Sequence, residues 1–98
     1  MKRRVVFHPE AETELNDATS RYDAESPGLG SALLADLERA IAQLIQYPES
    51  SPLVSRLVRR KSLRGFPYNI MYFVLPSAIR ILAVAHQKRR PFYWRDRK

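Results

Sequence analysis

The chain has 98 residues, of which 45% are hydrophobic, and a formal net charge of +7. A chain of this length forms one domain with a modest core, and its N-terminus carries only a three-residue apolar run, too short for an export signal or a membrane span. It contains no cysteine, which excludes disulfides and thiolate metal sites and fits a reducing compartment. We therefore expect one cytoplasmic domain over residues 1–98, with no membrane association, no cofactor and no metal.

The charges are segregated along the chain. Residues 9–50 contain nine acids and two bases, whereas residues 51–98 contain twelve bases and one acid. A basic half of this kind favours phosphates or an acidic protein surface as its partner.

The first half predicts one strand and two helices. Residues 3–8 are expected to form a short strand because three successive residues favour extended backbone. Pro9 and the acids after it mark the start of a helix that runs to about residues 23–25, with apolar residues at spacings of three and four. A Gly- and Pro-containing turn over 26–30 leads into a second amphipathic helix, which ends before Tyr47-Pro48.

The second half predicts three strands. Residues 56–63 fit a half-exposed strand, residues 68–75 a central strand covered on both faces, and residues 78–86 a returning inner strand. Ala83 and Ala85 are small enough to let another element approach that last strand closely. The order β-α-α-β-β-β predicts an α+β fold, an antiparallel helical hairpin packed on one face of a three- or four-stranded antiparallel sheet.

Two long segments resemble one known family: FHPEAETEL…SRYDAESPGLGSALLADLERAIAQLIQYPES and LRGFPYNIMYFVLPSAIRILAVAHQKRRPFYWRDR. They are similar to the RelE/ParE superfamily of type II toxin–antitoxin toxins over nearly the whole chain. The most specific part resembles the ParE-like branch: Phe66-Pro67-Tyr68, the AVAH of residues 83–86, Arg90-Pro91 and Tyr93-Trp94.

The resemblance implies the fold described above and a small cytoplasmic bacterial toxin of the plasmid-stabilisation type. It also implies a cognate antitoxin, whose acidic or amphipathic segment wraps around the toxin. Operator DNA would then be bound only through the antitoxin. The modest core and the basic second half agree with such a partner.

The superfamily contains two activities, and the fold alone does not choose between them. ParE-like members inhibit DNA gyrase, which needs a binding surface and no catalysis. RelE-like members cleave mRNA on the ribosome without a metal, which needs an acid, a base and cations around the phosphate. Ribonuclease members of the superfamily usually have an arginine at the start of the central strand, and several have a tyrosine directly after the histidine of the last strand or a few residues beyond it. This chain has Phe66-Pro67-Tyr68 at the first place, and Gln87 follows His86, with Tyr93 the nearest tyrosine. We therefore expect gyrase inhibition. A ribosome-dependent endoribonuclease is the alternative, and a non-toxic nucleic-acid-binding module is a second one.

The candidate site residues lie in the basic half. No catalytic residue is expected for a gyrase inhibitor; a nuclease would use Arg64, His86, Arg90 and Tyr93, with Glu49 a weaker candidate base. Target or antitoxin binding would use Arg59, Arg60, Lys61, Arg64, His86, Arg89, Arg90, Tyr93 and Trp94. Three alternatives stay open: His86 serves only as a structural hydrogen-bonding group, one of the residues 59–61 is merely solvated, and Tyr93 and Trp94 fold back to cap the core.

Overall fold

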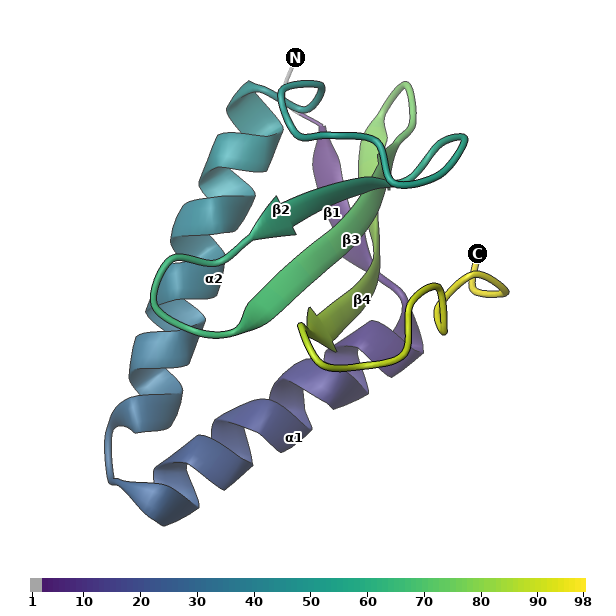
Figure 1. Ribbon diagram of the computed structural model, residues 1–98. Helices are drawn as coiled ribbons and strands as arrows, with labels where there is room; N and C mark the ends of the chain where they lie inside the picture. The colour runs from purple at the N-terminus through teal and green to yellow at the C-terminus, as the bar shows by residue number, and fades with distance from the viewer. Residues whose placement is uncertain (1–2) are drawn as a thin grey trace.

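The secondary structure follows the predicted order in the computed structural model, which describes residues 3–98 (Figure 1). The elements are β1 (Arg4–Phe7), α1 (Pro9–Glu25), α2 (Leu29–Gln46), β2 (Arg59–Ser62), β3 (Tyr68–Val74) and β4 (Ala78–His86). The α+β class and the β-α-α-β-β-β order are thereby confirmed.

Local chemistry sets the helix ends where the sequence predicts them. The Nδ1 of His8 accepts a hydrogen bond from the backbone N–H of Glu10 at 3.1 Å, so His8 caps α1 and Pro9 fills its first position. Between the helices, Gly28 has a φ of +90°, a left-handed conformation that glycine adopts at little cost. The chain can therefore reverse within a few residues, and α2 packs against α1.

The sheet has the strand order β1-β4-β3-β2. The two hairpin pairs, β2 with β3 and β3 with β4, are antiparallel as predicted, and β4 is an inner strand as predicted. The prediction of an entirely antiparallel sheet is wrong at one edge, because β1 pairs with β4 in parallel, from Arg4 opposite Ala78 to Phe7 opposite Ile81. The two helices between these strands carry the chain over one face, and such a long connection permits parallel pairing.

The strand β2 is shorter than the predicted 56–63. The preceding residues form a tight turn of their own, in which the N–H of Val54 donates to the carbonyl of Val58 at 2.8 Å, and Leu53 forms an isolated bridge with Arg59. Because these backbone groups are already paired, the ladder with β3 begins only at Arg59.

The sheet carries a core on each face. The larger core lies between the helices and the sheet and includes Leu33, Leu37, Ile70 and Tyr72. The smaller one lies on the opposite face, where Trp94 packs with the sheet. A β-bulge opposite Met71 makes Leu82 an extra residue in β4, so the alternation of faces along β4 shifts there by one residue.

Candidate binding surface

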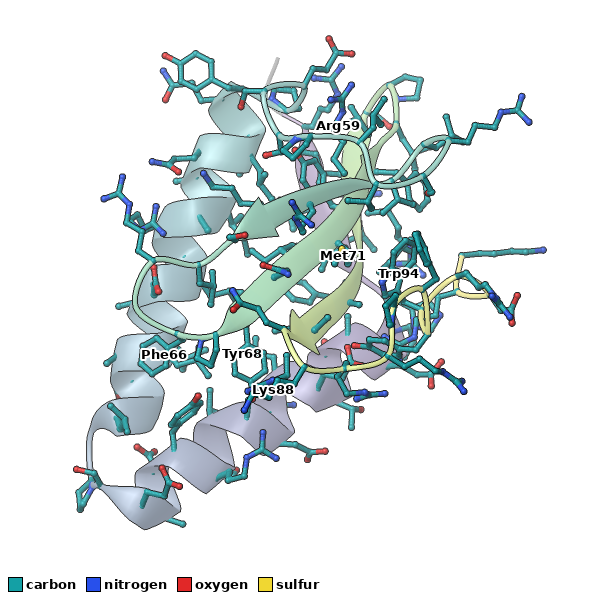
Figure 2. All side chains as sticks on the ribbon, viewed as in Figure 1. Arg59, Phe66, Tyr68, Met71, Lys88 and Trp94 are labelled. Atoms are coloured by element: carbon teal, nitrogen blue, oxygen red, sulfur yellow. The ribbon has the colours of Figure 1, made fainter. Side chains whose placement is uncertain are left out.

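The last twelve residues, 87–98, fold back across the sheet face that the helices leave open (Figure 1); we call them the tail. Trp94 is only 4% exposed and packs against Met71, Ala83 and Ala85. Figure 2 shows its indole beside Met71. The close approach that the small alanines predict is therefore made by the chain's own tail. The indole of Trp94 belongs to the core, so the alternative left open for it, that it folds back to cap the core, is present in the structure.

One carboxylate anchors the tail to α1. The Oε1 of Glu14 accepts hydrogen bonds from the N–H of Val84 and from Arg97 Nη1, each at 3.0 Å. Its Oε2 accepts from Arg97 Nη2 at 3.0 Å and from the hydroxyl of Tyr93 at 2.7 Å. Arg97 also donates to the carbonyl of Leu82 at 3.0 Å. The pairing of β1 with β4 ends at Ile81, so the carbonyl of Leu82 and the N–H of Val84 have no partner in β1. In this Glu14 anchor, Arg97 and Glu14 supply the hydrogen bonds that these two backbone groups need.

Tyr93 is held between charged groups. Burial raises the pKa of its hydroxyl well above the usual range, and the hydrogen bond to Glu14 and the charge of that carboxylate raise the pKa further. The guanidinium of Arg89 lies 3.8 Å from the centre of its ring, in cation–π contact. Tyr93 therefore orients Arg89 and keeps its own proton.

His86 sits at the end of β4 between two hollows. Its Nδ1 accepts a hydrogen bond from the N–H of Lys88 at 3.1 Å, and its ring meets Tyr68 edge to face at 5.1 Å. The hydroxyl of Tyr68 in turn accepts from Arg21 Nη2 at 2.8 Å. The structural role left open for His86 is thus present, while the ring still lines both hollows.

The larger hollow lies between the tail and the sheet and measures about 390 Å³; we call it the tail groove. Its floor is apolar and its walls carry cations, with no carboxylate among the residues that line it. The lining residues are Val54, Arg60, Asn69, Met71, Ala85, His86, Gln87, Arg89, Arg90, Pro91, Phe92, Tyr93 and Trp94. The other hollow, of about 350 Å³, faces α1 and contains Glu14 and Asp17.

The predicted residues divide into two groups. His86, Arg60, Arg89, Arg90 and Tyr93 come together at the tail groove. The remaining cations do not line it.

Each of those other cations has a separate place. Arg59 donates through Nη1 to the carbonyls of Ser51 at 2.7 Å and Glu49 at 3.1 Å, so it braces the loop before β2. Lys61 lies opposite Ile70, on the helix side of the sheet. Arg64 is exposed in the β2–β3 turn, where its backbone N–H lies 3.5 Å from Asp36 Oδ1.

The nuclease set is only partly assembled. His86, Arg90 and Tyr93 share the groove, but Arg64 does not, and the Tyr93 proton is held by Glu14. The side chain of Glu49 does not line the groove either. Within residues 3–98 we find no group of three or more His, Asp or Glu side chains that could hold a metal ion, and no helix long and apolar enough to cross a membrane.

Three residues that matter here escaped the sequence analysis. Glu14 reads as one of many exposed acids on an amphipathic helix, and its partner Arg97 is 83 positions away. Asn69 reads as a polar residue of a strand. Phe92 could have been identified from the sequence, because it lies between Arg90-Pro91 and Tyr93-Trp94, two parts of the pattern that carries the family resemblance.

The fold and the groove define a small basic protein with an α+β scaffold and a groove walled by cations. Residues 5–91 match the family model of the ParE toxin of the type II toxin–antitoxin system parDE, so the chain belongs to the ParE toxin family. Among solved structures it is similar to a chromosomal ParDE toxin–antitoxin system from P. aeruginosa. That likeness has a TM-score of 0.75 at 18% identity, covers 87% of this chain and 96% of the other, and supports the fold. A search of curated proteins found no match.

Proposed function

We propose that this ParE-type toxin arrests growth in the cytoplasm by binding and inhibiting DNA gyrase, and that a cognate antitoxin neutralises it. The observation that carries the proposal is the state of Tyr93 in the tail groove. Its hydroxyl donates to Glu14 at 2.7 Å and its pKa is raised, so it is unsuited to exchange protons with a substrate. His86 then has no second acid or base beside it among the described groove residues, whereas the cations around it suit binding.

Charge supports the same proposal. The acids of the chain lie mainly on the two helices, and the tail and β2 carry most of the bases. A surface with this polarity attracts an acidic partner from a distance and orients it at the groove. An acidic amphipathic segment of an antitoxin would cover the same cations and so block the target.

The first test is the order in which macromolecular synthesis stops. Cells are pulse-labelled for DNA and protein synthesis minutes after the toxin is induced without its antitoxin. We expect DNA synthesis to stop first, with a DNA-damage response, because a poisoned gyrase leaves cleaved DNA. If translation stops first, the ribonuclease alternative replaces this proposal.

The second test separates binding from catalysis at His86. In a supercoiling assay with purified gyrase, we expect His86→Gln to change the half-inhibitory toxin concentration by less than about tenfold, the effect of one hydrogen bond. If the toxin is a ribonuclease in which His86 is the general acid or base, His86→Gln would instead slow RNA cleavage about 10²- to 10⁴-fold. Reversing two groove charges, with Arg89→Glu and Arg90→Glu together, is expected to abolish inhibition while the circular dichroism spectrum stays unchanged.

A further inference from the structure

We propose that the tail groove binds a single-stranded segment of nucleic acid, with its phosphates on the groove arginines and one unstacked base on the ring of Phe92. The inference rests on the proposed function, since a toxin that contacts a strand of the DNA held by gyrase would grip the enzyme and its substrate together. It names the chemistry of the ligand, a phosphodiester chain carrying exposed bases.

The cations of the groove are placed for phosphates. Arg60 extends from β2 on the tail side of the sheet, because it lies opposite Met71, and Arg89 and Arg90 face it from the tail. Among the described side chains, Arg60 and Arg90 have no ion pair or hydrogen bond, and Arg89 contacts only the ring of Tyr93. Three arginines facing one hollow without a carboxylate make a site for a polyanion.

Phe92 supplies the aromatic surface. It is 43% exposed, and its φ of 61° makes it the one non-glycine residue with left-handed backbone within residues 3–98. Side chains rarely adopt this conformation, and such strain concentrates at binding sites. Here it turns the chain so that Trp94 enters the core while Phe92 stays outside, with the two ring centres 5.6 Å apart.

The combination points to nucleic acid in preference to an acidic peptide. A basic groove that follows a backbone, with an exposed aromatic ring beside it, is the arrangement that single-stranded nucleic acids use, because every base has a face that can stack. Asn69 and Gln87 add amide groups at the wall, which can pair with the edge of a base. A peptide of acidic residues would form ion pairs with the arginines but would make no contact that needs the exposed ring of Phe92.

The experiment compares oligomers that share phosphates and differ in bases. Binding of the purified toxin is measured by fluorescence anisotropy with a labelled thymidine decamer, an abasic deoxyribose-phosphate decamer, a uridine decamer and a glutamate decapeptide. We expect the thymidine decamer to bind about 5- to 150-fold more tightly than the abasic one, the range for one stacked base. Phe92→Leu keeps an apolar side chain and should remove that difference, while Tyr47→Leu, at an even more exposed aromatic residue outside the groove, should keep it.

The arginines are tested through salt dependence. Arg60→Ala is expected to reduce the slope of log affinity against log salt concentration by about 0.7, the value for one phosphate of a single strand. The exposed Arg56, outside the groove, provides the matched control Arg56→Ala, with an unchanged slope.

Equal binding of the thymidine and abasic decamers, no effect of Phe92→Leu, or binding of the glutamate peptide alone would each overturn the proposal. Tighter binding of the uridine decamer would uphold the site and assign it to RNA. The pulse-labelling experiment reports on the gyrase target independently, so a failure of the groove and a failure of the proposed function give different results.

Discussion

The Glu14 anchor gives the sharpest test of how the tail is held. The substitution Glu14→Gln keeps the shape of the side chain but removes its charge and replaces one acceptor oxygen with an NH₂ group. Arg97, whose side chain is only 10% exposed, then loses its main counter-charge, because Glu10 lies farther away at 3.6 Å and is largely exposed.

The cost can be worked out from the burial of the pair. Glu14 is 15% exposed and Arg97 10%, so the pair is nearly shielded from water. Removing one partner of a buried ion pair costs about 3–5 kcal/mol. Arg97 keeps its hydrogen bond to the carbonyl of Leu82, so we expect the loss of docking free energy to lie near the lower end of this range, at about 3 kcal/mol. The docked form of the tail should therefore become about 100-fold less favoured relative to the detached form.

Two residues report on the tail directly. The N–H of Val84 donates to Glu14, so its hydrogen exchange should accelerate about 100-fold in the variant if exchange follows detachment. Trp94 is the only tryptophan, so its fluorescence measures the docking of the tail without interference. We expect a red-shifted emission that acrylamide quenches more strongly, with helix content unchanged.

The control is Glu12→Gln, an exposed acid on the same helix, which should change neither signal. If Val84 exchange in Glu14→Gln stays close to that of the natural chain while Trp94 remains shielded, the carboxylate does not hold the tail and the reasoning is wrong.

Two further predictions concern stability away from the tail. Asp36 accepts bonds from Arg39 and from the N–H of Gly65; burial pushes its pKa up, but these bonds together hold it below 3.8. Asp36→Asn should therefore lower the free energy of unfolding by about 1–3 kcal/mol at neutral pH. Urea titrations at several pH values should show that the difference between the variant and the natural chain shrinks as the pH falls below 3.8, because the natural carboxylate then gains its proton. Gly30→Ala would place a Cβ 2.6 Å from the carbonyl of Thr19 where the helices meet, so it should cost about 1–3 kcal/mol in thermal unfolding, while Gly65→Ala, with 3.5 Å to its nearest neighbour, should be nearly neutral.

The parts of the fold that could be predicted are those set by local chemistry. Pro9, the Gly28 turn and Tyr47-Pro48 mark helix ends through backbone restrictions that any context must respect. The hairpin of β3 and β4 follows from two apolar runs joined by a short turn at Pro76.

Pairing between distant segments was beyond prediction. Nothing local to Val5 and Val6 tells whether their strand runs with or against β4, because that depends on the path of the helices between them. The bulge at Leu82 is equally invisible, since the apolar run continues through it.

The candidate site was predictable in outline only. Charge and aromatic content located it in the second half, and Arg60, His86 and Arg89 do meet there. Arg59 binds two backbone carbonyls and Trp94 packs in the smaller core. Each of these roles depends on the direction in which the side chain points from the backbone. The sequence shows the type of each residue but not the direction of its side chain.

The parallel pairing of β1 with β4 also has a consequence for the timing of folding. The last strand to be synthesised is bonded on both sides, by β1 and by β3, so the sheet stays in separate pieces until Ala78–His86 has left the ribosome. The two helices can form earlier, but until then they lack the central strand against which they pack. The tail, which forms one wall of the groove, follows β4 in the chain. The tail groove therefore cannot assemble before the sheet is complete.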